Sequence, residues 1–207
     1  MILEACVGNI HQAKMAEKLG AHQIELCDRL DLDGLSPSFE MVRKTCEAVS
    51  IPVKVIVNPK PFDYTYNASE LNFISQYINK LNNYSISGIV FGALTPDAVP
   101  DLSALNSIAK HTSHPITFHK AVDSSRDILE STAMLKKQGI IKYILSSGGG
   151  KTAKDGQPNL LEMKKILEES SISLIAAGSI TNENLLSHHD VLDLKYYHGK
   201  KIVGNLD

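Results

Sequence analysis

A chain of 207 residues, 43% hydrophobic and 21% charged, has the composition of an ordinary soluble protein and needs no metal or disulfide to fold. The formal net charge is −2 and the basic residues are scattered, which excludes the basic surface that nucleic-acid binding requires. No apolar run is long enough for a membrane span and residues 1–9 lack the features of a secretory signal, so we expect a cytoplasmic protein with three reduced cysteines.

Short apolar runs alternate with longer segments of helical periodicity, which is typical of βα units that build a parallel sheet. The predicted strands are residues 2–7, 23–26, 53–57, 88–91, 116–118, 143–145, 174–177 and 191–194. The predicted helices are residues 11–19, 39–49, 69–81, 103–110, 128–138, 160–168 and 184–188. An open doubly wound sheet gives a similar alternation, but eight evenly spaced units favour a single α/β domain over residues 1–207, a TIM (β/α)8-type parallel barrel.

The predicted barrel is shortened at its C-terminus. Beyond the last strand and its connection only residues 198–207 remain, and a closing helix needs about 11 residues plus a connection. The outer faces of the first and last strands are therefore expected to be thinly covered. Because large exposed apolar patches usually mark interfaces, we expect a homo-oligomer, most simply a two-fold dimer.

The first two strands each contain the pattern Glu-x-Cys, in Leu-Glu-Ala-Cys at residues 3–6 and Ile-Glu-Leu-Cys at residues 24–27. Side chains two residues apart share a face of a strand, and barrel sites form where strands end. Cys6 and Cys27 are therefore expected to meet at the barrel mouth, where paired thiolates would suit a soft ion such as Cu(I). The alternative is that both are buried as small hydrophobic residues, as we expect for Cys46.

Charged residues on the same strands give a second group of candidates. A cluster of Glu4, Glu25 and Lys54 could hold the barrel together or could support acid–base chemistry above it. His119 ends the fifth strand and Asp123 follows it, which places a candidate general acid or base at the mouth. The alternative for His119 is a structural histidine held by hydrogen bonds.

Two glycine-rich turns follow the sixth and seventh strands, at residues 146–150 and 178–180. Such turns expose backbone N–H groups that can hold a phosphate or carboxylate, which makes Ser147, Gly148, Gly178 and Ser179 a candidate anion site. The alternative is a simple turn in which glycine supplies positive φ.

These motifs resemble the CutC family of copper homeostasis proteins. The resemblance rests on residues 3–6, 24–27, 33–38, 51–53, 88–94, 116–123 and 144–148, which occur in the family's order over almost the whole chain. It implies a TIM barrel, a cytoplasmic location and a Cu(I)-binding role, with Cys6 and Cys27 matching the cysteines proposed as ligands. It implies no known reaction.

The chain also departs from the family pattern. Residues 58–64 keep Pro59 and Asp63 of an arginine- and glycine-rich loop but lack its first arginine, and residues 195–197 replace the usual end of strand eight. The leading hypothesis is a copper-homeostasis protein whose partner is a copper ion. The main rival is a barrel enzyme that acts on a small phosphorylated or carboxylated metabolite with Glu25, Lys54 and His119, and a third hypothesis is an interaction scaffold without chemistry.

Overall fold

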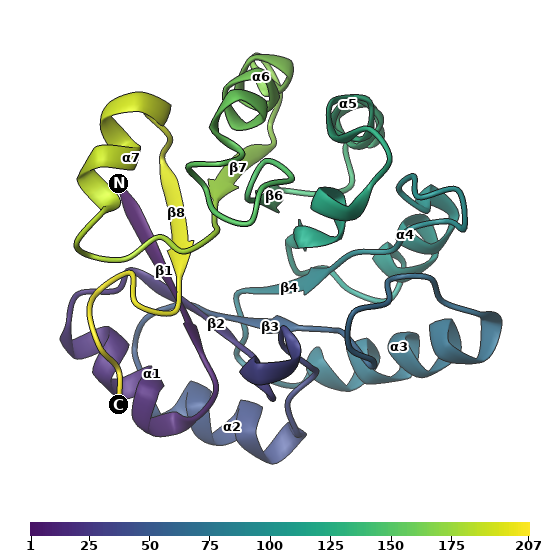
Figure 1. The fold of residues 1–207 in the computed structure, drawn as a ribbon. Coiled ribbons are helices and arrows are strands. Elements are labelled where there is room, and N and C mark those ends of the chain that lie inside the picture. Colours follow the sequence, from purple (N-terminus) through teal and green to yellow (C-terminus); the bar gives the residue numbers. More distant parts are fainter.

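In a computed structural model that describes residues 1–207, eight parallel strands close into a barrel in sequence order, β1-β2-β3-β4-β5-β6-β7-β8 (Figure 1). The strands are β1 (Ile2–Val7), β2 (Gln23–Leu26), β3 (Val53–Ile56), β4 (Gly88–Phe91), β5 (Ile116–Phe118), β6 (Tyr143–Ser146), β7 (Ser173–Ala176) and β8 (Tyr196–Gly199). The helices are α1 (Ile10–Lys18), α2 (Phe39–Ala48), α3 (Ala68–Leu81), α4 (Leu102–Ala109), α5 (Ile128–Gln138), α6 (Gln157–Leu167) and α7 (Leu185–Leu192), with short 3-10 helices η1 (Leu30–Leu32) and η2 (Lys120–Ser124). The predicted TIM-type parallel barrel is confirmed.

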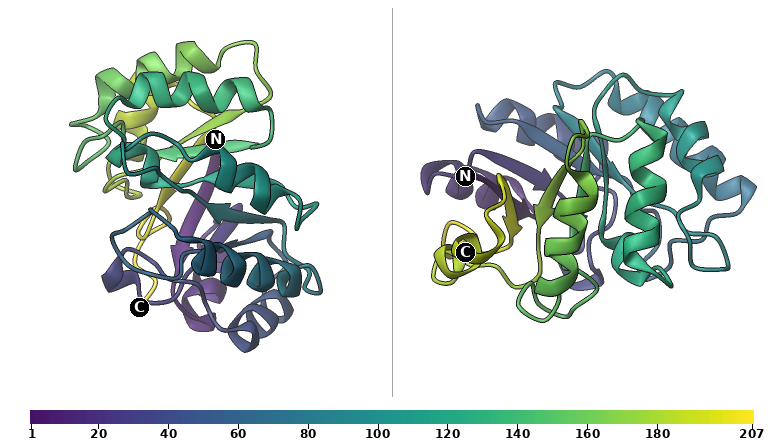
Figure 2. Two further views of the ribbon diagram at one scale, coloured as in Figure 1. Left: turned by 90° about the vertical axis from the view of Figure 1, so that its right-hand side faces the viewer. Right: turned by 90° about the horizontal axis from the view of Figure 1, so that it is seen from above.

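The helices lie on the outside of the barrel, as two further views show (Figure 2). Local sequence determines where several of them begin and end. The Ser38 side chain accepts the Met41 N–H at the start of α2, and Asp127 accepts two N–H groups at the start of α5. Gly139, with φ of 64°, ends α5. No helix is both long and apolar enough to cross a membrane.

The strands present different chemistry to their two sides. Outward side chains such as Ile24, Phe91 and Phe118 pack against the helices in the main apolar core and are fully buried. Inward side chains form only small apolar clusters, and between these lie buried charged residues, among them Glu4 and Lys54. The outward layer therefore supplies most of the hydrophobic stabilisation, and the inside of the barrel is where polar side chains gather.

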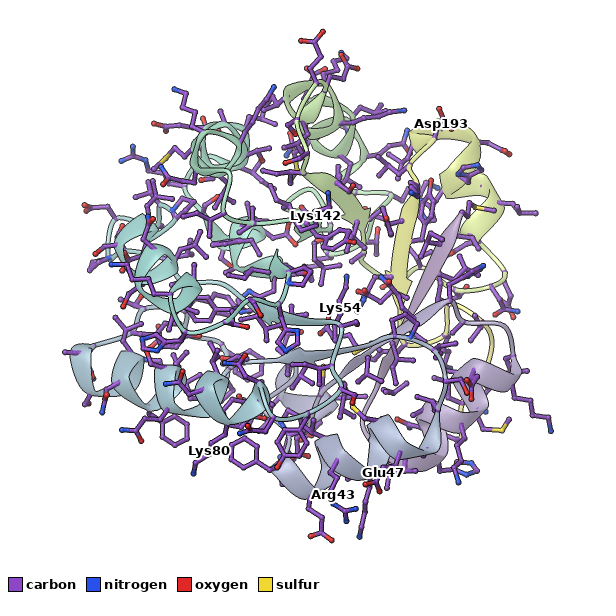
Figure 3. The ribbon with its side chains drawn as sticks, turned by 180° about the vertical axis from the view of Figure 1, so that it is seen from behind. Arg43, Glu47, Lys54, Lys80, Lys142 and Asp193 are labelled. Carbon is purple, nitrogen blue, oxygen red and sulfur yellow. The ribbon has the colours of Figure 1, made fainter.

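The prediction for the eighth strand is wrong in position. Residues 191–194 were expected to form it, but α7 continues to Leu192 and ends at Asp193, whose φ is 43° (labelled in Figure 3). The apolar spacing is helical, because Leu185, His188 and Leu192 are buried on one face while Val191 is exposed. The strand that closes the barrel is β8, which pairs with both β7 and β1.

The chain after β8 covers the side of the barrel that was expected to be bare. Ile202 and Leu206 are 1% and 4% exposed and belong to the main core. The C-terminus lies beside α1 (Figure 1), where Gln12 Nε2 donates to Asp207 at 2.9 Å. The outward-facing Tyr197 of β8 is fully buried. The expected uncovered strand is therefore absent, and the homo-oligomer stays a prediction without that argument.

Candidate functional site

A cavity of about 440 Å³ opens at the C-terminal ends of the strands. It collects side chains and backbone from most of the barrel. Among its lining residues are Cys6, Glu25, Cys27, His119, Gly178 and His198. Polar groups from several strand ends line this cavity, so it is the candidate functional site.

The two cysteines of the Glu-x-Cys pattern lie next to each other in this cavity. Cys6 is in β1 and Cys27 follows β2, and these parallel neighbours place the two Sγ atoms 3.7 Å apart. The residues are 6% and 1% exposed and pack against Ile56 and Val90. The expected geometry of adjacent thiols at the mouth is therefore present.

The surroundings separate the acidity of the two thiols. The hydrogen bond from Cys27 stabilises the Cys6 thiolate and outweighs burial, and His198 adds to this, so the pKa of Cys6 falls to about 5. The Cys27 pKa is raised well above its usual value by that hydrogen bond, burial and the nearby charges of Cys6 and Glu25. Glu25 Oε1, 3.2 Å from Cys27 Sγ, is an alternative acceptor for the same single S–H proton. The pair is thus one thiolate and one thiol at neutral pH.

Beneath the thiols, a buried ionic network crosses the barrel. Lys54 Nζ lies 2.7 Å from Glu4 Oε2, and His198 Nδ1 lies 2.9 Å from Glu4 Oε1. Gln23 Nε2 donates to Glu4 Oε2 at 2.6 Å. Burial opposes charge on Glu4, but Lys54 and His198 overcome it and lower the pKa of Glu4 to about 2. For His198, hydrogen bonds with Cys6 and Glu4 outweigh burial and raise the pKa well above its usual value.

Lys54 does not lie with Glu25 and His119, the residues with which it was predicted to form a catalytic group. It lies inside the ring of strands (Figure 3) but does not line the cavity. Its inward position in β3 is one layer below that of Ile56, so its ammonium group meets Glu4 and the ring of Tyr143, whose centroid is 4.0 Å away. Lys54 therefore supports the site from below and does not share the cavity with Glu25 and His119.

Glu25 lines the cavity and is only partly satisfied. Its Oε2 atom has no hydrogen-bond partner and lies 3.9 Å from His198 Nδ1. Burial raises the pKa of Glu25 to about 7, since the attraction of His198 only partly offsets burial and the negative charges of Cys6 and Glu4. Near neutral pH this carboxyl group can exist in either protonation state.

His119 lines the cavity from the end of β5 and is 5% exposed. Its Nδ1 accepts the Ala121 N–H at 3.1 Å, so the neutral ring carries its proton on Nε2, which has no partner. Burial lowers the pKa of His119 to about 4. The predicted general base is therefore a poor one, because at neutral pH the ring offers only a donor at Nε2.

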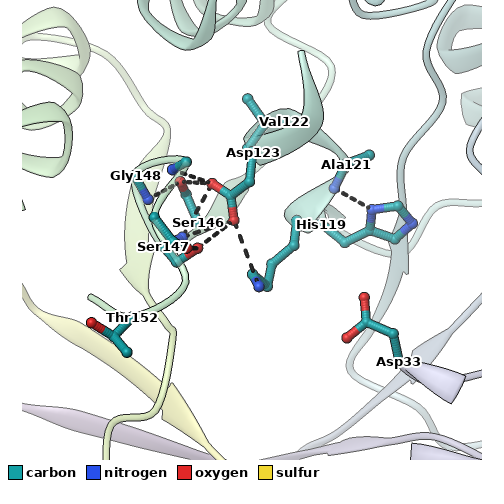
Figure 4. A network of polar contacts seen from close by, with 12 residues as sticks. Asp33, His119, Ala121, Val122, Asp123, Ser146, Ser147, Gly148 and Thr152 are labelled. Atoms are coloured by element: carbon teal, nitrogen blue, oxygen red, sulfur yellow. Dashed lines mark hydrogen bonds and ion pairs between the residues drawn. The ribbon is translucent and has the colours of Figure 1, made fainter. Parts of the chain in front are cut away.

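Asp123 has a different role from the predicted catalytic one (Figure 4). Its carboxylate accepts hydrogen bonds from Ser146 Oγ at 2.5 Å, Ser147 N at 3.0 Å, Ser147 Oγ at 2.8 Å and Gly149 N at 3.1 Å. The Gly148 N–H donates to Ser146 Oγ at 2.8 Å. The first glycine turn is thus filled by the chain's own carboxylate, which corrects the prediction that Ser147 and Gly148 bind an external anion.

The second glycine turn lines the cavity through Gly178 and Ser179, so an anion site there stays a prediction.

One important residue of the site, His198, was missing from the sequence prediction. It faces inward because it lies two residues after Tyr196 in β8, and the misplaced eighth strand concealed this alternation.

Comparison with known proteins gives a consistent picture. The model of the CutC family matches residues 1–203. A human relative named copper homeostasis protein cutC homolog is 33% identical over 187 residues, covering 89% of this chain and 67% of the relative. A CutC family protein of Pasteurella multocida is 30% identical, covering 89% of this chain and 75% of the relative.

Two solved structures share the fold. CutC from Streptococcus agalactiae superimposes with a TM-score of 0.91 at 23% identity, covering 98% of this chain and 99% of the other. A phosphonopyruvate hydrolase superimposes with a TM-score of 0.68 at 14% identity, covering 98% of this chain and 76% of the other. At these identities the likeness concerns the barrel alone.

Proposed function

Because the chain belongs to the CutC family, we propose that it acts in copper homeostasis by binding Cu(I) as cargo through Cys6 and Cys27. The observation that carries the proposal is the 3.7 Å separation of the two sulfur atoms at a cavity. A Cys6 thiolate is ready to bind a cation without first losing a proton. Thiolates are the ligands that select soft ions such as Cu(I).

The donor set fits one ion. Taking a metal–sulfur bond of about 2.3 Å, an ion bound to both sulfurs 3.7 Å apart would make a sulfur–metal–sulfur angle of roughly 107°. A bent pair leaves room for a further ligand. The nearest protein candidate is Glu25, whose carboxylate oxygen lies within 4.8 Å of both sulfurs. Because carboxylate is a hard ligand, the two cysteine sulfurs supply the preference for copper, and Cys27 would lose its proton when it binds the ion.

The test is an anaerobic titration with Cu(I) against a competing chelator. The wild-type protein should bind one Cu(I), and the Cys6→Ser/Cys27→Ser variant should lose this binding while keeping its circular dichroism spectrum. Cys46→Ser is the matched control, because Cys46 is half-buried in α2, away from the cavity, and should bind as the wild type does. Unchanged affinity in the double variant would refute these ligands.

The proposal includes a cytoplasmic location, since a reducing compartment keeps the paired thiols free. It also retains the homo-oligomer as a prediction. Light scattering at micromolar concentration tests the assembly, and a strict monomer would refute it.

A second candidate function is proton transfer on a small phosphorylated or carboxylated metabolite. The observation that favours it is the unpartnered Oε2 of Glu25 in a cavity that His119 also lines. Proton NMR in deuterium oxide would detect exchange at carbon atoms next to carbonyl groups in a panel of such compounds. Glu25→Gln should abolish exchange, and Glu47→Gln on the exposed face of α2 should not. Absence of exchange in the wild type with every compound would dismiss this function.

A further inference from the structure

Three successive N–H groups at the end of β7 have no acceptor within the protein. They belong to Gly178, Ser179 and Ile180, all of which line the mouth cavity. Gly178 and Ser179 have φ of 103° and 58°, so the backbone curls on itself after the strand. Successive N–H groups in such a turn form a concave site of positive potential that attracts anions.

The first glycine turn of this barrel shows what such groups require. At residues 147–149 the N–H groups are occupied by Ser146 and by the carboxylate of Asp123. No acidic side chain of the chain accepts from the N–H groups of Gly178, Ser179 or Ile180. The two turns therefore differ in that the second lacks an internal anion.

Cationic side chains line the same cavity. Lys200 and Lys201 follow β8, and Lys120 follows β5. Lys200 Nζ donates to the Leu30 carbonyl at 2.8 Å, which fixes its position across the mouth. Lys201 is exposed and lines the cavity. Asp33 and Glu25 also line the cavity, but the three lysines outnumber them, and Lys201 lies on the β7–β8 side of the mouth, which favours an anionic ligand there.

A buried side chain points to the same conclusion independently. His119 is 5% exposed, lines the cavity and has an unpartnered Nε2. A buried donor left without an acceptor costs free energy, which a ligand oxygen would recover. Because burial lowers the pKa of His119 to about 4, the ring stays neutral and donates from Nε2 at physiological pH.

We propose that the N–H groups of Gly178, Ser179 and Ile180, together with Lys201, bind the oxyanion of a small organic phosphate or carboxylate, with His119 as a further donor to the ligand. The cavity volume of about 440 Å³ suits a metabolite more than a lone inorganic ion. The strand β8 lies between β7 and β1, so the proposed site shares the cavity with Cys6 but does not require a metal there. This inference is independent of copper binding.

The test is an NMR titration of the ¹⁵N-labelled metal-free protein with 2-phosphoglycolate and, separately, malonate. The expected result is saturable movement of the amide signals of residues 178–180 with at least one probe, and the stronger probe identifies phosphate or carboxylate as the preferred group. Lys201→Met and His119→Phe should each weaken binding about fivefold or more, as expected for hydrogen bonds and contacts with a charged group.

Lys142→Met is the matched control, because Lys142 is exposed at the opposite end of the barrel and should leave the affinity unchanged (Figure 3). The His119→Phe affinity is interpreted only if the amide spectrum of this variant is that of a folded barrel. If the variant does not fold, the affinity of Lys201→Met alone tests the proposal. The proposal would be overturned if neither probe moved the amide signals of residues 178–180. It would also be overturned if Lys201→Met and Lys142→Met weakened the binding equally.

Discussion

Replacing Lys54 by methionine should destabilise the barrel strongly, because Glu4 would remain charged and buried. Glu4 is fully buried, and its pKa of about 2 lies about 2.5 units below the ordinary value of 4.5. At 1.36 kcal/mol per unit, this shift corresponds to about 3 kcal/mol of stability at neutral pH. Removing one partner of a buried ion pair costs about 3–5 kcal/mol in general. We therefore expect Lys54→Met to lose about 3 kcal/mol or more at pH 7.

The assay is urea unfolding followed by circular dichroism at several pH values. The folded-state pKa of Glu4 is below its unfolded value, so its contribution is fully present above pH 4.5 and is lost as the pH falls towards about 2. In Lys54→Met the folded-state pKa of Glu4 should rise towards or above its unfolded value, so this acid-induced loss of stability should shrink. Glu4→Gln/Lys54→Met should recover much of the stability, and Lys142→Met is the surface control. A loss below about 1 kcal/mol for Lys54→Met, or no recovery in the double variant, would refute the reasoning.

Three further substitutions test other parts of the structure by the same unfolding assay. The pKa of His119 is about 4, against an ordinary value of 6.5, so the free energy of unfolding should fall by about 3 kcal/mol as the pH falls from 6.5 to 4. His119→Phe should remove this pH dependence, and an unchanged pH profile in the variant would contradict the prediction. Gly148→Ala should cost several kcal/mol more than Gly139→Ala, since both have positive φ but only at Gly148 would a Cβ meet a backbone oxygen, at 2.1 Å; equal losses would contradict the clash. Leu206→Ala should cost about 2–5 kcal/mol if the tail is part of the core, and a loss near zero would show that it is not.

The sequence predicted the barrel well because its outward strand positions carry a strong apolar signal. Residues such as Ile24, Phe91 and Phe118 are buried between strand and helix, and their short runs are separated by helices of clear periodicity. The prediction of the eighth strand was wrong because it relied on the same apolar signal. The residues of β8 include Tyr196, Tyr197 and His198, which are less apolar than the last turn of α7. The strand was therefore predicted at the more apolar residues 191–194.

The site was predictable in part. The period of two placed Cys6 beside Cys27 and put Lys54 close to Glu4, because strand alternation depends only on sequence spacing. It could not say at what depth each side chain lies, since depth depends on the stagger between strands. The spacing also could not show that the Asp123 carboxylate binds the first glycine turn. Ser147 and Gly149 follow Asp123 by 24 and 26 positions, and the intervening helix hides this contact from any local pattern.

The distribution of charge inside the barrel argues that its interior is shaped by the site above it. Buried ion pairs give little net stability compared with apolar packing, so Glu4, Lys54 and His198 are a costly way to fill a core. Their contacts reach the mouth: His198 bonds Glu4, and its positive charge favours the Cys6 thiolate. On the other side of the barrel, Leu145 and Ile175 fill the same space with apolar side chains. The polar network therefore lies where it can set the charge of the thiols, and substitutions within it should change thiol reactivity as well as stability.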